Sequence, residues 1–409
     1  MKIYLVGGAI RDHMLGLPVK ERDWVVVGST PEELLALGYK SVGKDFPVFL
    51  HPETKEEYAL ARTERKTAPG YKGFVTDFNQ DITLEEDLKR RDLTINAIAQ
   101  DELGEYLDPL NGIQDIKNKK LKHISHSFKE DPVRILRIAR FAARFASLGF
   151  TVDPSTNLLM QDMVKNGEVD ALVPERVWQE TDKALGEHSP QIFFSTLKNC
   201  EALKIIFPEI HNLYGVPNPP QHHPEIDTGI HTMMVLEQAA KLSTNKRVRF
   251  SALVHDLGKA LTPAHLWPKH HGHEMKSVRL VEKLCARLKV PKTYQRLAVK
   301  VAEYHGMCHR AFELRAETVA RLLKQLDAFR QPDDFYDFLI CCIADSRGRT
   351  GFEDRDYKQA DYLATCFDAA RKIKSAPFLD EGYEGIELAK VMYEAQVSAI
   401  GSVKTNWKV

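Results

Sequence analysis

Two carboxylates near the N-terminus have a spacing that suggests chemistry. Glu21 and Asp23 lie two positions apart at the start of the segment ERDWVVV. If that segment is a strand, both side chains project from one face. Adjacent like charges destabilise one another unless a cation lies between them, and Mg²⁺ prefers oxygen ligands of this kind. The pair alone favours a simpler interpretation, a polar strand entrance that faces water.

A glycine pair precedes these carboxylates. Gly7 and Gly8 end the strand candidate KIYLV, and without Cβ atoms they let the backbone turn and approach a ligand closely. The helix that follows presents unpaired amides to an anion, and Arg11 lies one turn further on. A lone glycine pair predicts only a strand, a turn and a helix. Combined with the carboxylate pair, it indicates phosphates bound beside a divalent metal, as in nucleotidyl transfer by two metals.

Another segment, EDPVRILRIAR, indicates a way of reading nucleobases. It places Asp131, Arg134, Arg137 and Arg140 three residues apart, which is also typical of a charged helix face. Cytosine and adenine share an edge with an amine donor beside a ring-nitrogen acceptor, whereas uracil and guanine present a carbonyl beside an N–H. An aspartate that accepts from the amine and an arginine that donates to the ring nitrogen would therefore select C and A.

These segments resemble a known family. GGAIRD with the carboxylate pair resembles the nucleotidyltransferase domain of the DNA polymerase β superfamily, specifically the class of bacterial CCA-adding enzymes and poly(A) polymerases. KRRDLTINA, residues 89–97, is similar to the RRD motif of that class, although its spacing alone predicts only a basic helical turn. EDPVR is similar to its EDxxR motif. The carboxylate pair is commonly Asp-x-Asp there, so Glu21 is a departure that leaves the metal spacing open.

The resemblance implies a role for each of these residues. Glu21 and Asp23 are implied to be catalytic and to hold Mg²⁺, with Glu57 as a third acidic position. The implied nucleotide-binding residues are Gly8, Arg11, Arg91, Asn96, Asp131, Arg134, Arg137 and Arg140. Within that set, Asp131 and Arg134 read the base, and the two later arginines contact base or phosphate. Asp92 is implied to orient its neighbours in the RRD motif.

The C-terminal half contains the dipeptide His255–Asp256 in HDLGK, which alone means little. Other histidines and an aspartate strengthen it, because imidazoles and carboxylates from separate helices bind divalent transition metals. The pattern resembles the HD phosphohydrolase superfamily. The resemblance implies catalytic roles for this dipeptide and a metal-ligand set of His231, His255, Asp256 and Asp345. His273 and His305 are then ligands of a second metal, phosphate ligands or scattered surface histidines.

The chain as a whole resembles the bifunctional γ-proteobacterial subgroup of CCA-adding enzymes, on segments such as FPVFLHP, HPEIDTGIHT and WPKHHGH. The resemblance implies template-independent transfer of CMP and AMP from CTP and ATP to the tRNA 3′ end. It also implies phosphatase, 2′-nucleotidase and 2′,3′-cyclic phosphodiesterase activities, with Mg²⁺ for transfer and a transition metal such as Ni²⁺ for hydrolysis. The alternatives are a poly(A) polymerase of the same family, a longer uridylyltransferase type with an HD domain, and a non-catalytic tRNA-binding protein.

The elements that must position these residues change in character along the chain. Short strand candidates (DWVVVG, FPVFLH, EEYALAR, LGEYLDP) lie in the first 120 residues, where capping boxes at Thr30 and Thr83 predict two helices. The second helix is expected to run through TLEEDLKRRDLTINAIA, and residues 63–82 to form a mobile loop. From Glu130 onward helical periods dominate.

These patterns predict an α+β fold followed by helical domains. We expect a nucleotidyltransferase head with a small mixed sheet at residues 1–125 and an all-α neck and body at 126–210. An all-α HD domain at 225–350 and a helical tail at 351–409 follow, and the Pro- and His-rich stretch 207–229 is the expected linker.

Composition sets broad limits. The 409 residues are 43% hydrophobic, with 57 basic and 57 acidic residues, which is ordinary for a globular protein. No run has membrane-spanning length, and the six cysteines are expected to be reduced thiols in a cytoplasmic protein that is a monomer or a weak homo-oligomer. The candidate tRNA contacts, which solvated side chains would equally explain, are Lys117, Lys119, Lys120, Lys122, Arg176 and Trp178.

Overall fold

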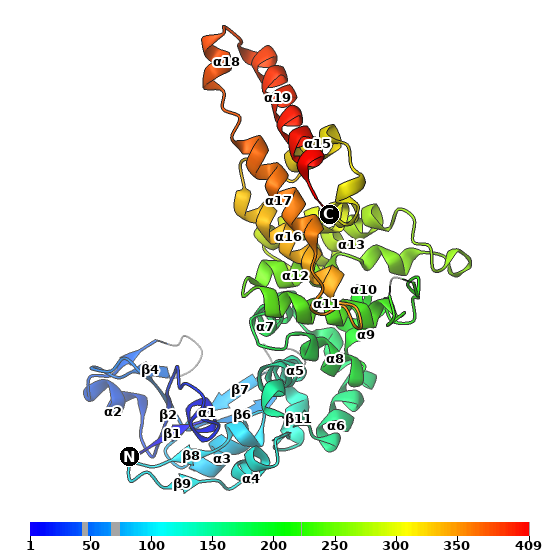
Figure 1. Cartoon of the computed structure of the whole chain (residues 1–409). Coiled ribbons are helices and arrows are strands. Elements are labelled where there is room, and N and C mark those ends of the chain that lie inside the picture. Colours follow the sequence, from blue (N-terminus) through cyan, green and yellow to red (C-terminus); the bar gives the residue numbers. More distant parts are fainter. Residues whose placement is uncertain (43–47, 67–73, 222, 409) are drawn as a thin grey trace. The chain divides into compact units, whose positions relative to one another are not determined.

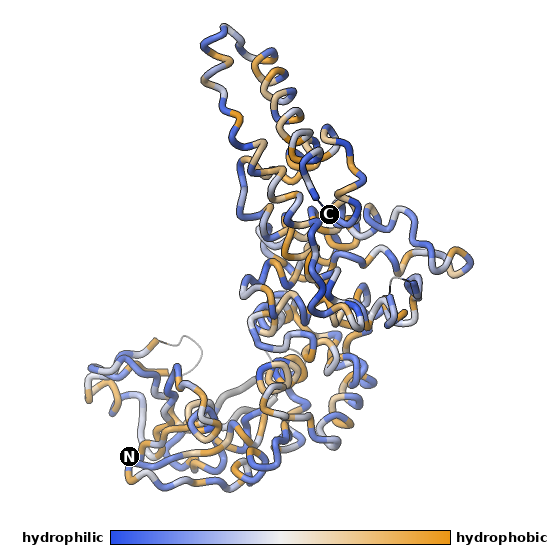
Figure 2. The backbone as a smooth tube through the Cα atoms, in the orientation of Figure 1, coloured by the Kyte–Doolittle hydropathy of each residue, from blue (hydrophilic) through white to orange (hydrophobic). Residues whose placement is uncertain are grey.

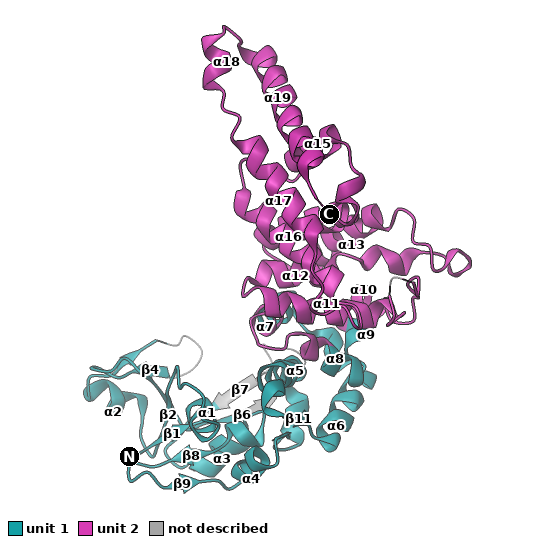
Figure 3. Ribbon diagram, viewed as in Figure 1, with its two compact units in different colours: residues 1–180, 195–205 teal, residues 181–194, 206–409 magenta. Residues whose placement is uncertain are grey.

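A computed structural model of the chain describes residues 1–42, 48–66, 74–221 and 223–408. The chain forms two compact units, residues 1–180 with 195–205 and residues 181–194 with 206–409 (Figure 3). In the described residues every strand belongs to the first unit, whereas the second is helical (Figure 1). The predicted fold class, an α+β head followed by helical domains, is therefore confirmed.

A mixed sheet forms the centre of the first unit. Its strand order is β3-β4-β5-β2-β1-β8-β9, and only the β2–β5 pair is parallel. The strands are β1 (Lys2–Val6), β2 (Asp23–Val27), β3 (Lys40–Ser41), β4 (Val48–Leu50), β5 (Glu57–Leu60), β8 (Ala99–Gln100) and β9 (Tyr106–Leu107). Val25 and Val26 in the middle of β2 are buried, so the hydrophobic run that follows Asp23 anchors this strand in the sheet.

Local signals predicted the helix after Gly8 and the helix starts after Thr30 and Thr83, whereas the fourth helix of this group, at residues 112–117, was not predicted. These helices are α1 (Gly8–Met14), α2 (Pro31–Ala36), α3 (Leu84–Lys89) and α4 (Gly112–Lys117). Thr30 and Thr83 both form complete capping boxes, in which each side chain accepts from the backbone amide of a glutamate three residues later. Gly38, with φ of 87°, follows the end of α2.

Two sequence predictions for this unit are wrong. Within the expected loop 63–82, β6 (Thr63–Lys66) and β7 (Phe74–Asp77) pair as antiparallel strands, and residues 67–73 lie outside the described residues. The predicted long helix from Thr83 ends at Lys89, and a 3₁₀ turn, η1 (Thr94–Asn96), follows. Leu93 explains this end, because it is fully buried and bridges to His123, which draws the backbone out of the helix.

A second group of helices belongs to the first unit only in part, because residues 181–194 and 206–211 are assigned to the second unit. The helix α5 (Val133–Phe145) carries the predicted arginines and is followed by β11 (Thr151–Val152), which pairs with β10 (Lys120–Leu121). The remaining helices up to residue 211 are α6 (Pro154–Lys165), α7 (Pro174–Leu185), α8 (Gln191–Asn199), α9 (Leu203–Ile206) and α10 (Pro208–His211). Helical structure therefore dominates from Glu130, as the sequence predicts.

The expected linker at 207–229 is instead part of the second unit. Its hydrophobic residues Phe207, Ile210 and Leu213 are buried, and Pro217 bridges to Asp227. Prolines and histidines in this stretch form a packed, irregular segment, because the buried apolar residues between them outweigh its loop-like composition.

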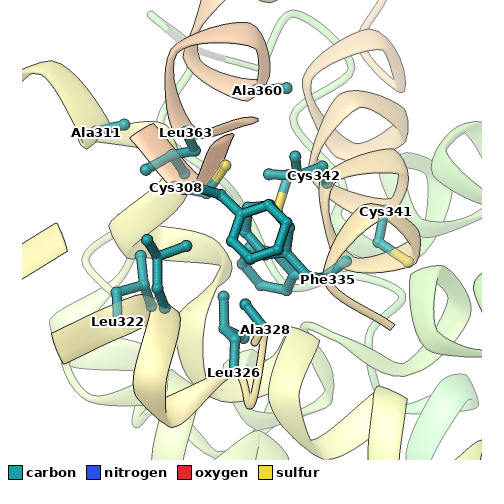
Figure 4. Close-up of a cluster of buried hydrophobic side chains, with 14 of the residues drawn as sticks. Cys308, Ala311, Leu322, Leu326, Ala328, Phe335, Cys341, Cys342, Ala360 and Leu363 are labelled. Carbon is teal, nitrogen blue, oxygen red and sulfur yellow. The ribbon is translucent and has the colours of Figure 1, made fainter. Parts of the chain in front are cut away.

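The second unit has a core built from several helices. They are α11 (Thr228–Leu242), α12 (Lys246–Val254), α13 (His273–Leu288), α14 (Lys292–His309), α15 (Ala316–Gln325), α16 (Pro332–Arg347), α17 (Lys358–Arg371), α18 (Ala376–Asp380) and α19 (Gly385–Asn406). Phe335, Leu322, Leu363, Cys308 and Cys342 lie in this core (Figure 4). All six cysteines of the chain are buried thiols. Hydrophobic and hydrophilic residues intermingle along the helices (Figure 2), and none of the described helices is both long and apolar enough for a membrane span.

Candidate nucleotide pocket and metal centre

One cavity of about 560 Å³ in the first unit collects most of the residues predicted for nucleotide transfer. Its lining includes Gly8, Arg11, Asp23, Arg91, Asn96, Asp131, Arg134, Arg137 and Arg140. Residues separated by more than 100 positions therefore meet at one place. Of the predicted set only Glu21 is missing from the lining, while Glu57, the third acidic position, belongs to it.

Two carboxylates meet through the parallel pair of β2 and β5 in the mixed sheet. The register of β2 and β5 sets Asp23 opposite Glu57. β2 begins at Asp23, so the expectation that Glu21 shares its strand face is wrong, and Glu21 lies exposed in the preceding loop. Burial raises the pKa of Asp23, and the nearby charge of Arg91 lowers it. Glu21 still lies close enough for its negative charge to raise the pKa of Asp23 further. A cation would relieve this concentration of negative charge.

The turn at the end of β1 brings the backbone against an arginine. Gly7 has φ of 73°, and a Cβ built on it would lie 3.0 Å from Nη1 of Arg91. Arg11 is 3% exposed, and its guanidinium donates to Asp12 (2.9 Å) and to the side-chain oxygen of Asn96. Burial lowers the pKa of Arg11. Both arginines therefore approach the turn, Arg91 at Gly7 and Arg11 at Gly8, where a Cβ would lie 3.3 Å from Arg11 Nη2. Arg91 is itself held by Asp87, to which its Nη2 donates at 3.1 Å.

Asp92 links the RRD-type segment to α5. Its carboxylate accepts from Asn96 Nδ2 at 2.9 Å and from Arg137 Nε at 2.7 Å. Burial alone would raise the pKa of Asp92, but Arg137 and the Asn96 amide hold it well below its ordinary value. Asn96 consequently has its amide fixed from both ends, by Asp92 and by Arg11.

Asp131 and the arginines of α5 form the other side of the cavity. Asp131 precedes the helix and caps it by accepting from the Val133 amide at 3.0 Å. Arg134 donates to the carbonyls of Ser127 (3.0 Å) and Arg90 (2.8 Å), which orients its guanidinium. Arg140 donates to Glu180 at 2.7 Å.

Sequence reasoning did not place Arg176 in this wall. Arg176 was a candidate for tRNA contact, yet it lines the cavity and donates to both oxygens of Asp131, at 3.2 and 2.9 Å. Arg176 and Glu180 are four residues apart on α7, so they lie on the same helix face. That spacing was a visible signal, but the sequence could not show what the face packs against.

The second unit assembles the predicted HD residues. His231 lies on α11, Asp345 on α16, and His255 with Asp256 directly after α12 rather than on it. Nε2 of His231 is 3.0 Å from Asp345 Oδ1, and Nε2 of His255 is 3.2 Å from Asp256 and 3.6 Å from Asp345. Although burial lowers the pKa of His255, the two aspartates raise it to about 10.

The histidines are oriented for metal binding. His231, His255, His273 and His305 each direct Nδ1 to a backbone carbonyl at 2.8–3.0 Å. Donation from Nδ1 fixes the tautomer that leaves Nε2 as a free ligand atom. Nε2 of His255 and Oδ1 of Asp256 are buried without a hydrogen-bond partner among the described residues. This donor set fits a divalent transition metal.

His273 and His305 belong to the same centre and are not scattered surface residues. Their Nε2 atoms lie 3.1 and 3.5 Å from Asp256 Oδ1, whereas His255 faces the other oxygen. Asp256 thus stands between two groups of potential ligands. The glycine of HDLGK permits this, because a Cβ on Gly258 would lie 2.1 Å from the carbonyl oxygen of His273.

Two residues beside this centre were also missed. Nε2 of His309 lies 2.6 Å from Asp345 Oδ2, and its Nδ1 lies 2.7 Å from the Tyr357 hydroxyl. On the other side, Oε1 of the buried Glu225 lies 3.0 Å from Nδ1 of His231. No sequence motif marked these residues, because their contacts join separate segments.

Comparisons with known proteins agree with both sites. The poly A polymerase head domain family matches residues 3–122, the HD domain family residues 228–331, and the family described as a probable RNA and SrmB-binding site of polymerase A residues 149–214. The multifunctional CCA protein of Thioalkalivibrio sulfidiphilus is 60% identical over 407 residues and covers 100% of both chains. The chain belongs to the multifunctional CCA proteins.

Other relatives support this assignment. The multifunctional CCA protein of Teredinibacter turnerae is 56% identical over 99% of this chain and 98% of its own. The Thermotoga maritima CCA-adding enzyme complexed with tRNA has a TM-score of 0.63 at 19% identity, over 100% of this chain and 88% of that chain. A CCA-adding enzyme in complex with ATP gives 0.67 at 19% identity, over 98% and 86%. At such identity these structures show a shared fold.

Membership of the multifunctional CCA proteins confirms the family predicted from the three N-terminal segments and HDLGK. The protein is an enzyme that joins a nucleotidyltransferase head to an HD hydrolase domain. Both domains are of metal-dependent types. The predicted polar residues of the head line one cavity, and those of the HD domain form one histidine and aspartate cluster.

Proposed function

We propose that the cavity of the first unit transfers two CMP and one AMP from CTP and ATP to the 3′ end of tRNA, with release of pyrophosphate. This proposal rests on one observation. A single cavity is lined by the carboxylates of Asp23 and Glu57, by the glycine turn at residues 7–8, and by Asp131 with Arg134. The names of the relatives and the solved neighbours that contain tRNA, ATP and CTP support it.

Asp23 and Glu21, with Glu57 beside them, would hold Mg²⁺. When bound, the metal activates the tRNA 3′-hydroxyl and stabilises charge on the phosphates. Arg91 lies between Gly7 and Asp23, since it approaches the first sterically and influences the pKa of the second. It is therefore placed to bind the triphosphate, while Gly8 leaves room for it.

The remaining predicted residues would orient the nucleotide. Asn96, whose amide is fixed from both ends, is proposed to meet the ribose. Asp131 and Arg134 are proposed to read the base. Arg137 and Arg140 already pair with carboxylates, so their contribution is to hold α5 in register with Asp92 and α7.

We further propose that the HD domain hydrolyses phosphomonoesters and 2′,3′-cyclic phosphates. His231, His255, Asp256 and Asp345 would hold a transition metal such as Ni²⁺, and His273 and His305 would serve a second ion on the other oxygen of Asp256. When bound, such metals supply an activated water and polarise the phosphoryl oxygens. These activities would prepare damaged or cyclised tRNA ends for addition.

The proposed partner is tRNA, held through its shape and backbone. Lys117, Lys119 and Lys122 are exposed, and residues 149–214 match a family named for RNA binding. A monomer or weak homo-oligomer in the cytoplasm remains our expectation from the sequence.

One experiment tests transfer. The protein is incubated with tRNA that lacks its 3′ end and with single labelled nucleotides. We expect two C and then one A to be added and U and G to be refused; an unbounded A tail would instead identify a poly(A) polymerase. Separately, His255→Ala should abolish hydrolysis of 2′,3′-cyclic AMP while CMP addition continues.

A further inference from the structure

We propose that Arg176 is a specificity-determining residue of the nucleotide pocket: it fixes Asp131 so that this carboxylate meets the amine of C or A and cannot reach the ring N–H of U or G. This inference rests on the proposed reading of bases by Asp131. Arg176 acts through Asp131, so it is a positioning residue.

The contact between the two side chains is bidentate. Nη1 of Arg176 lies 3.2 Å from Oδ1 of Asp131, and Nη2 lies 2.9 Å from Oδ2. Two parallel bonds from a planar guanidinium fix both the place and the plane of a carboxylate. The Val133 amide donates a third bond to Oδ1, which ties Asp131 to the start of α5.

The number of acceptor sites then restricts what Asp131 can do. An ionised carboxylate offers about four lone-pair sites. Three donors occupy it, two on Oδ1 and one on Oδ2. About one site remains, on Oδ2, which suits a single amine hydrogen. The base therefore has no need to displace Arg176 in order to be read.

A carboxylate without this anchor would discriminate less. Uracil and guanine carry a ring N–H beside the carbonyl that stands in place of the amine. An aspartate free to rotate can move its acceptor to that ring N–H, and the wrong base is then no longer left with an unpaired donor. Since unpaired polar groups are what make such selection strong, the selectivity would fall.

The same helix face supplies a matched control. Glu180 lies four residues after Arg176 and holds Arg140, which is two turns from the start of α5. Arg176 forms a charged pair with Asp131, just before α5, and Glu180 forms one with Arg140 on α5. Because Arg176 contacts the proposed base reader Asp131, comparing the two variants separates a general loosening of the two helices from a specific loss of base selection.

The test compares Arg176→Met, Arg176→Lys and Glu180→Gln with the wild type, measuring kcat/KM for CTP and UTP on tRNA that lacks its 3′ end. Arg176→Met should raise the UTP-to-CTP ratio about tenfold, because a charge-assisted bidentate contact is lost. Arg176→Lys, with a single point contact, should give an intermediate ratio. Glu180→Gln should lower both values alike and leave the ratio unchanged.

Two results would overturn the inference. An unchanged ratio in Arg176→Met, with addition still measurable, would show that Asp131 needs no anchor. An equal rise in Glu180→Gln would show that helix packing, and not Arg176, sets the selectivity. If Arg176→Met does not fold, the intermediate ratio of Arg176→Lys decides the question. Failure of the wild type to prefer CTP over UTP would refute the proposed function itself, which is a separate outcome.

Discussion

Arg137 donates to Asp92 across 45 positions of sequence, with Nε 2.7 Å from Oδ2. The pair joins the RRD-type segment, which carries the proposed phosphate and ribose ligands, to the helix that carries the proposed base readers. Asp92 is 6% exposed, so its charge depends on this partner. Two motifs that the sequence shows separately are thus joined by an ion pair whose carboxylate is buried and whose guanidinium is partly exposed.

Asp92→Asn should therefore lower the free energy of unfolding by about 2 kcal/mol at pH 7, because the buried side chain loses charge-assisted bonds to Arg137 and Asn96, while the partly exposed Arg137 can still be hydrated. The pKa of Asp92 in the folded state lies below the value of about 3.9 in an unfolded chain. Its stabilisation is thus fully present above about pH 4 and is lost as the pH falls below that value. Denaturant titration at pH 7 and pH 3 should show the difference between variant and wild type shrinking in acid.

The surface pair Lys129–Asp162 is the control for this prediction. The Asp162 carboxylate is exposed and screened by water, so Asp162→Asn should lower the free energy of unfolding much less than Asp92→Asn does. Equal losses in the two variants would contradict a special role for the buried carboxylate of Asp92.

The proposed metal pair of the head is tested by charge removal. Asp23→Asn and Glu21→Gln should each lower CMP addition about a hundredfold or more, because roughly 3 kcal/mol of charge stabilisation is lost. Glu21→Asp restores the Asp-x-Asp spacing of the family and should stay within about tenfold of the wild type. Wild-type activity in Glu21→Gln would restrict the metal to Asp23 and Glu57, the two carboxylates that line the cavity.

The sequence predicted what local chemistry controls. Capping at Thr30 and Thr83, the glycine turn after β1 and the hydrophobic run of β2 each depend on neighbours in the chain, and all were found. The hairpin of β6 and β7 was missed because TERK shows no alternation of polar and apolar residues.

The residues of the site divide in the same way. Those inside recognisable segments meet in the cavity or the HD centre, with Glu21 displaced because the strand begins two residues later. Arg176, His309 and Tyr357 could not be predicted, because each acts on a residue at least 36 positions away. Such contacts depend on how helices pack, which no short motif encodes.

The close approach of the backbone to Gly258 leads to a prediction about the stability of the HD domain. Its Cβ position would lie 2.1 Å from the His273 carbonyl oxygen and 2.5 Å from the Ser277 amide, both backbone atoms that cannot move aside easily. Gly258→Ala should therefore lower the free energy of unfolding by about 2 kcal/mol or more, measured by denaturant titration. Gly306→Ala is the matched control, because its nearest neighbour is a side-chain oxygen at 3.3 Å and alanine favours a helix. Similar losses in both variants would refute the close-approach argument.

The contact between Tyr357 and His309 leads to a prediction about metal affinity. Its hydroxyl is 2.7 Å from Nδ1 of His309, whose Nε2 is 2.6 Å from the ligand Asp345. If the hydroxyl donates to Nδ1, then Nε2–H donates to the carboxylate and fixes its orientation. Tyr357→Phe removes one oxygen and should weaken binding of Ni²⁺, followed by calorimetric titration of the metal-free protein, about tenfold.

A second tyrosine provides the comparison. Tyr362 is also buried, but its hydroxyl has no hydrogen-bond partner among the described residues, so Tyr362→Phe should leave Ni²⁺ affinity unchanged. Loss of affinity in both variants would point to general loosening of the helical core. Unchanged affinity in Tyr357→Phe would show that Asp345 holds its position without the His309–Tyr357 pair, and that the other contacts of Asp345 suffice.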